Sequence, residues 1–137
     1  KDPTGLLNIV SPLVRKIYEG DTFKLDPHSA AAHTNRGNVY LDQGDYERAI
    51  AVYSEALAIN PTYVIAYINR GQAHKALNNL SQTRAEFNQA LTYLDHPQLD
   101  MQPRNHPDLQ ATDLDDLATW IRNTRRRVTA YLDELAA

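Results

Sequence analysis

Between residues 30 and 94, small and apolar side chains recur every three or four positions, which is the period of one face of an α-helix and not of a strand. The first run, residues 30–41, stops before Gly44, a residue suited to the left-handed C-cap of a helix. Asp45 then supplies an N-cap for a second run, residues 46–60. The pattern predicts a helical hairpin.

The hairpin recurs after 34 residues, because the triplet Asn35-Arg36-Gly37 returns as Asn69-Arg70-Gly71. The same offset places Asn78 where the first unit has Gly44, and Asn also tolerates the left-handed conformation. Asn79 and Gln82 then predict a capping box for the last helix of this unit. Two consecutive hairpins are therefore expected.

Two dipeptides at the same offset are typical helix starts, with Asp or Asn as N-cap and Pro at the first helical position. They are Asp26-Pro27 and Asn60-Pro61. Each predicts the beginning of the first helix of a hairpin.

This unit resembles the tetratricopeptide repeat, which has a Gly between aromatic positions in its first helix and Ala, aromatic and Ala in its second. The first repeat matches at Gly37, Tyr40, Gly44, Asp45, Tyr46, Ala49, Tyr53, Ala56 and Pro61. The second matches at Gly71, Phe87 and Ala90, but has Thr83 in place of Ala, Leu80 in place of an aromatic residue, and its closing Pro displaced to Pro97. The resemblance implies an all-α superhelix of stacked hairpins.

The chain therefore divides into five segments. We expect residues 1–29 to form a capping helix or degenerate repeat, with an apolar helix over residues 4–19, and residues 30–63 and 64–97 to form the two repeats. A loop containing proline, residues 98–112, leads into a long C-terminal helix, residues 113–137.

The C-terminal helix has an apolar seam at steps of three and four, comprising Leu114, Leu117, Ile121, Thr124, Val128, Tyr131 and Leu135. Such a helix covers the open face of the last repeat, as stacked repeats require. The alternative is a coiled-coil dimer, but about three heptads with a Thr in the seam are marginal for pairing. We therefore favour a C-terminal helix that caps the last repeat, and a monomeric protein.

The chemistry for catalysis is missing from the 137 residues. There is no cysteine, no glycine-rich phosphate loop, no histidine pair at metal spacing and no nucleophile-elbow serine motif. We expect no enzyme activity, no cofactor and no metal. The formal charge of −3 predicts no general attraction to nucleic acid, and no apolar run is long enough for insertion into a membrane.

One basic cluster runs against the acidic balance: Arg122, Arg125, Arg126 and Arg127. A solvated helix face is the favoured interpretation, and contact with phosphate or an acidic peptide is the alternative.

The resemblance also implies where a partner binds, because the first helices of these repeats line a concave groove that takes peptides or partner helices. By position, the groove residues are Thr34, Asn35, Asn38, Leu41, Asp42, Ile65, Ile68, Asn69, Gln72 and Lys75. Asn and Gln each offer a donor and an acceptor, which suits hydrogen bonding to a ligand backbone.

Asn38 and Asn69 coincide with two asparagines by which some family members grip the acidic tails of heat-shock chaperones. Thr34 stands where that clamp has its first Lys, so the same specificity is not expected.

We thus expect a protein-interaction, scaffold or assembly module. A dimerisation domain and a regulatory domain of a larger protein are the alternatives. The chain starts at Lys1 and not at Met, which suggests a piece of a longer protein. A cytoplasmic location is favoured only weakly.

Overall fold

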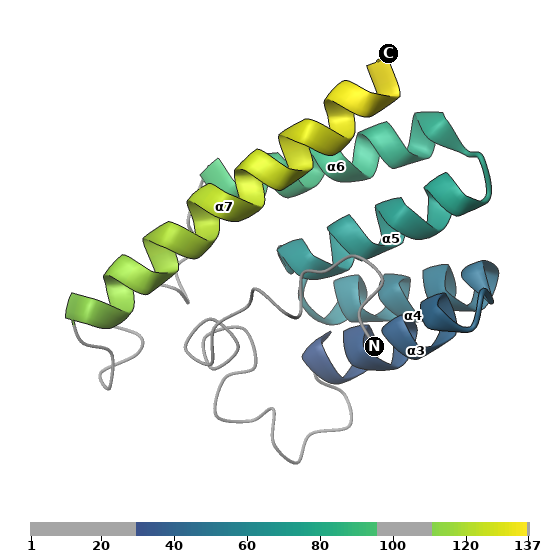
Figure 1. The fold of residues 1–137 in the computed structure, drawn as a ribbon. Coiled ribbons are helices and arrows are strands. Elements are labelled where there is room, and N and C mark those ends of the chain that lie inside the picture. Colours follow the sequence, from purple (N-terminus) through teal and green to yellow (C-terminus); the bar gives the residue numbers. More distant parts are fainter. Residues whose placement is uncertain (1–29, 96–110, 137) are drawn as a thin grey trace.

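The computed structural model describes residues 30–95 and 111–136, with side chains of the last helix from residue 118 onward, and every element in these ranges is a helix. The helices are α3 (Ala30–Asp42), α4 (Tyr46–Ile59), α5 (Val64–Ala76), α6 (Leu80–Asp95) and α7 (Ala111–Ala136) (Figure 1). The all-α class is confirmed. The predicted N-terminal helix, residues 4–19, and the proline-containing loop lie outside the described residues.

Both hairpin turns use the left-handed backbone that the sequence predicts. Gly44 has φ 78° and Asn78 has φ 61°. The N-caps that follow are also present: the Asp45 carboxylate accepts from the Arg48 N–H at 3.3 Å, and Asn79 Oδ1 from the Gln82 N–H at 3.5 Å. The two equivalent turns therefore close the two hairpins in the same way.

The predicted helix start at Asn60-Pro61 is wrong. Asn60 is the C-cap of α4, and α5 begins at Val64 with Tyr63 as its N-cap. The Asn60 side-chain oxygen accepts from the N–H and the hydroxyl of Thr62, at 3.2 and 2.8 Å. Since these bonds form a turn across Pro61, the next helix begins three residues later.

Within each hairpin, a glycine of the first helix lies against an aromatic ring of the second. A Cβ atom on Gly37 would be 2.5 Å from Cε1 of Tyr53, and one on Gly71 would be 2.6 Å from Cε1 of Phe87. Both rings are completely buried. Glycine is thus required by the close approach of the two helices, and not by an unusual backbone angle.

Small residues of the second helices complete these contacts. Ala49, Ala56 and Ala90 are fully buried, whereas Tyr40 is half-buried beneath the Arg48 guanidinium, 5.3 Å from its ring centroid. Pro61 is exposed in the turn, and its carbonyl accepts from the Tyr67 hydroxyl at 2.6 Å.

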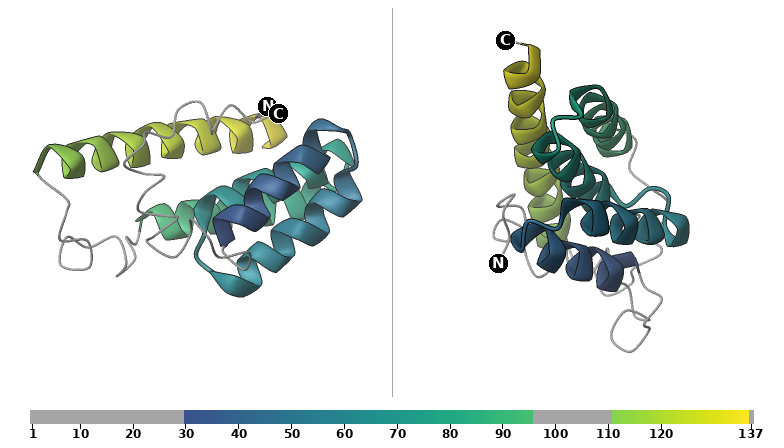
Figure 2. Two further views of the ribbon diagram at one scale, coloured as in Figure 1. Left: turned by 90° about the horizontal axis from the view of Figure 1, so that it is seen from below. Right: turned by 90° about the vertical axis from the view of Figure 1, so that its right-hand side faces the viewer.

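The hairpins stack through α4 and α5, and α7 continues the stack by packing against α6 (Figure 1). Trp120, Thr124 and Val128 of α7 are buried, and the ring of Tyr131 lies 5.5 Å from that of Phe87. The views in Figure 2 show α7 extending beyond the hairpins at one end.

The described seam residues of α7 are therefore engaged within the chain. Arg125 fixes the same helix to the end of α6, where it reaches the Asp95 carboxylate at 2.7 Å and the Leu94 carbonyl at 3.3 Å. None of the described helices has the length and apolar character required to span a bilayer.

Candidate protein-binding surface

A buried set of hydrogen bonds joins three helices beneath the predicted groove. Asn38 Oδ1 of α3 accepts from the Tyr53 hydroxyl of α4 at 2.5 Å and from Asn69 Nδ2 of α5 at 2.7 Å. Tyr53 and Asn69 are fully buried and Asn38 is 4% exposed. Because each partner belongs to a different helix, the bonds fix the first hairpin relative to the first helix of the second.

This network uses only part of the hydrogen-bonding capacity of the two amides. Asn38 Nδ2 and Asn69 Oδ1 are buried and have no hydrogen-bond partner in the described part of the chain. Buried amide groups normally form hydrogen bonds with both their nitrogen and their oxygen. This pair therefore keeps one nitrogen donor and one oxygen acceptor that are not used.

Six of the ten predicted groove residues are buried. They are Thr34, Asn38, Leu41, Ile65, Ile68 and Asn69. Their side chains are in contact with other parts of the chain, and their role in ligand binding stays a prediction. The Thr34 hydroxyl donates a hydrogen bond to the Ala30 carbonyl at 2.8 Å, and Asn69 donates one to Asn38. The apolar residues Leu41, Ile65 and Ile68 pack in the core.

The other four predicted groove residues reach the surface. Asn35 and Asp42 are exposed, and Gln72 and Lys75 are partly exposed. Asn35 lies about one turn before Asn38 in α3, and Gln72 about one turn after Asn69 in α5. Asn35, Asp42 and Gln72 thus lie about one turn from the buried amide pair, and Lys75 lies nearly two turns from Asn69 along α5. We call these four side chains the α3–α5 surface.

Asn35 and Asn69 occupy the same place in the two repeats but differ completely in burial. Asn69 is enclosed because α5 packs against α4 and α6 and also contacts α3, whereas α3 packs mainly against α4. The equivalent pair Val39 and Ala73 behaves alike: Val39 is 54% exposed and Ala73 is fully buried.

Lys75 also contacts the last helix. Its Nζ lies 3.6 Å from the Glu134 carboxylate of α7, and the two side chains are 40% and 65% exposed. Exposed ion pairs contribute only about 0 to 1 kcal/mol, so Lys75 can exchange this partner for a ligand carboxylate at little cost.

A second polar cluster lies between α5 and α6. Arg70 forms a two-pronged ion pair with the buried Glu86 carboxylate, with Nη2 to Oε1 at 2.8 Å, and His74 Nε2 lies 3.8 Å from the same carboxylate. Burial lowers the pKa of His74 even though the nearby Glu86 charge raises it. Burial likewise raises the pKa of the Tyr67 hydroxyl, and its neighbour Tyr93 adds to the effect. We therefore interpret this cluster as a structural contact that holds α5 against α6.

The described residues contain no group of three or more His, Asp or Glu side chains placed to hold a metal ion.

Two family models match parts of the chain that include α3, α4 and α5. One, described as TPR repeat, matches residues 37–78, and another, described as Tetratricopeptide repeat, matches residues 22–51. The chain contains tetratricopeptide repeats. Tetratricopeptide repeats pack as hairpins in an α–α superhelix, which is the arrangement of α3 to α6.

Proteins with such repeats are also similar to this chain. It is 37% identical over 57 residues to small glutamine-rich tetratricopeptide repeat-containing protein 2 of Saccharomyces cerevisiae, covering 42% of this chain and 16% of that protein. It is 33% identical over 51 residues to Hsp70-Hsp90 organizing protein 1 of Glycine max, covering 37% and 9%.

A third relative is tetratricopeptide repeat protein 6 of Homo sapiens, which is 33% identical over 60 residues, or 44% of this chain and 12% of that protein. The match thus spans less than a fifth of the length of each relative.

Proposed function

We propose that this chain binds a segment of a partner protein through the α3–α5 surface, and that its role is stoichiometric rather than catalytic. The proposal rests on a contrast: buried hydrogen bonds fix helices α3 and α5, whereas exposed polar side chains on the same helices are available for a ligand. The Asn38–Tyr53–Asn69 network holds α3 and α5 in place, while Asn35 and Gln72 make no hydrogen bond within the described part of the chain.

The chemistry of the four side chains suits a peptide segment. Asn35 and Gln72 can each donate to a carbonyl and accept from an N–H, which are the groups that every peptide backbone offers. Asp42 and Lys75 carry opposite charges, so they can select charged ligand side chains. The rigid support lowers the entropy cost of ordering the binding residues.

The similarity to a protein named as an organizer of two other proteins supports the general class of function. The repeats match, but Thr34 differs from the basic residue of the chaperone-tail clamp, and Asn38 and Asn69 are buried. We therefore do not extend the proposal to chaperone tails.

Dimerisation through α7 is less well supported. Thr124 and Val128, two of its seam residues, are fully buried against the rest of the chain. A coiled coil through the seam would first require α7 to leave α6, with loss of the Arg125–Asp95 pair.

The test is quantitative affinity capture with wild-type protein and the Asn35→Ala/Gln72→Ala variant. A matched control is Asn88→Ala/Gln82→Ala, which removes one exposed Asn and one exposed Gln from α6. We expect a partner captured by the wild type and the control to be depleted with the first variant. Equal capture by all three proteins contradicts the proposal.

A further inference from the structure

The outer face of α7 carries two arginines that take no part in the packing of the described helices. Arg122 and Arg126 are exposed, lie one turn apart, and form no ion pair with any carboxylate of the described residues. Within that part of the chain, Arg122 donates to Thr119 of its own helix, at 3.3 Å. Arg125, by contrast, is committed to Asp95 and the end of α6.

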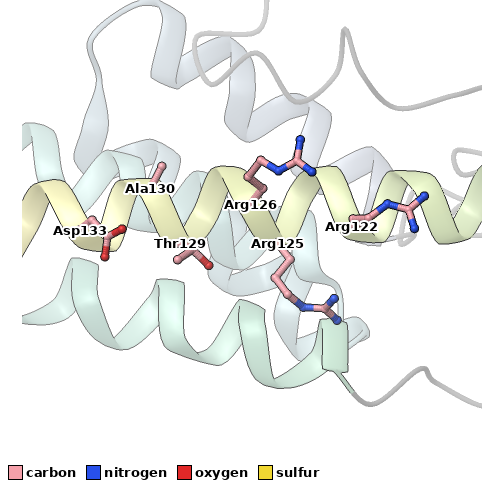
Figure 3. A pocket seen from close by; sticks show the side chains of 6 residues that line it. All are labelled: Arg122, Arg125, Arg126, Thr129, Ala130 and Asp133. Atoms are coloured by element: carbon pink, nitrogen blue, oxygen red, sulfur yellow. The ribbon is translucent and has the colours of Figure 1, made fainter.

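Figure 3 shows this division of roles: Arg125 points toward α6, whereas Arg126 points away from it. Two like charges at positions i and i+4 destabilise a helix by about 0.2 to 0.5 kcal/mol. A purely solvated face does not require that spacing, and a Glu at either position would remove the repulsion.

Small residues leave space beside the guanidinium groups. A hollow of about 420 Å³ is lined by Arg122, Arg125, Arg126, Thr129, Ala130 and Asp133 (Figure 3). A second hollow of about 350 Å³ shares Arg126 and Ala130 with the first and adds Asn123 and Arg127. A ligand can therefore approach the arginines from the side and not only at their tips.

The helix beneath these side chains is anchored. Trp120, Thr124 and Val128, on the opposite face of α7, are buried. The two free arginines are thus held on a fixed backbone at one-turn spacing, which lowers the ordering cost of binding.

We propose that this outer face of α7 is a docking surface for an acidic segment of a partner protein, whose Asp or Glu carboxylates pair with Arg122 and Arg126. Arginine is suited to this role because its planar fork binds a carboxylate with two parallel hydrogen bonds. The positive pair stands out from a chain whose formal charge is −3, so the attraction is local to this face.

A protein segment fits this surface better than a nucleic acid. Neither hollow is lined by an aromatic side chain on which a base could stack. Asp133 lines the first hollow and repels a continuous phosphate backbone, whereas a peptide can place a Lys, Ser or Gly at that point.

The test is fluorescence anisotropy with a fluorescein-labelled Glu-rich peptide, a Gln-rich peptide of equal length, and a labelled oligouridylate. We expect the Glu-rich peptide to bind, more weakly as salt rises, and the Arg122→Gln/Arg126→Gln variant to lose at least about tenfold in affinity. The Gln-rich peptide should not bind.

The matched control is Arg48→Gln/Arg84→Gln, which removes the same charge from exposed arginines of α4 and α6. Circular dichroism first establishes that all variants are folded. Equal loss in both double variants, or tighter binding of the oligouridylate than of the peptide, overturns the proposal.

The Asn35→Ala/Gln72→Ala variant separates this surface from the α3–α5 surface. It should bind the Glu-rich peptide as the wild type does. Loss of peptide binding in that variant, with none in the α7 variant, would assign the acidic ligand to the α3–α5 surface and end the proposal for α7.

Discussion

Replacing Gly37 by Ala tests whether hairpin packing depends on the bare backbone of that residue. In an ordinary helix the change is favourable, since Ala is preferred to Gly by about 0.5 to 1 kcal/mol. At Gly37 the added Cβ would lie 2.5 and 2.7 Å from two ring carbons of Tyr53, while ordinary contacts are 3.4 to 4 Å. The two effects therefore have opposite signs.

The clash should win. Tyr53 is fully buried, and its hydroxyl is bonded to Asn38, so the ring cannot turn away without breaking that bond. Overpacking of a core costs about 1 to 3 kcal/mol, and an intrusion of this depth belongs in the upper part of that range. After the helix preference is subtracted, we expect Gly37→Ala to lower the free energy of unfolding by about 1 to 2 kcal/mol.

The assay is urea unfolding followed by circular dichroism, with the slope compared between variants. Combining Gly37→Ala with Tyr53→Leu removes the ring that the methyl group meets, so the double variant should be more stable than the sum of the single changes predicts, by about 0.5 to 3 kcal/mol. An unchanged or increased stability of Gly37→Ala would show that the close approach is not rigid and refute this reasoning.

Two further predictions concern buried polar groups. Tyr53→Phe removes one of the two bonds to Asn38 Oδ1 and should lower the free energy of unfolding by about 0.5 to 1.5 kcal/mol, with no change in helix content by circular dichroism. An effect below the error of the urea experiment would mean that Asn69 alone satisfies this oxygen. The pKa of His74 is lowered by folding, so the unfolded chain binds its proton first as the pH falls. Stability should therefore decrease as the pH falls from about 6.5 through the folded pKa, and His74→Gln should reduce that decrease. Identical pH profiles of the two proteins would exclude His74 as its source.

Much of the fold follows from local sequence chemistry. The turns at Gly44 and Asn78 are predictable because few residues adopt positive φ, and the cap at Asp45 because few side chains satisfy a free backbone N–H. The helix start at Asn60-Pro61 was mispredicted. Asn60 can cap the end of one helix or the start of the next. Because its side chain bonds to Thr62 in the turn, it caps the end of α4.

The candidate surface was predictable only in part, because burial depends on neighbours that a repeat pattern does not contain. Asn35 and Asn69 are equivalent in sequence, but only Asn69 lies within the stack. The Tyr53–Asn38 bond could have been anticipated, since a repeat-core Tyr needs a partner for its hydroxyl. The Lys75–Glu134 contact joins residues far apart in the chain, so no local sequence pattern predicts it.

The central claim is that a partner segment lies on the α3–α5 surface, above amides that stay buried. Its most direct test is NMR of the side-chain amide groups during titration with a partner segment identified by affinity capture. We expect large shifts for the amides of Asn35 and Gln72, with those of Asn88 and Gln82 unchanged. Shifts confined to Asn88 and Gln82, with Asn35 and Gln72 unaffected, would contradict it.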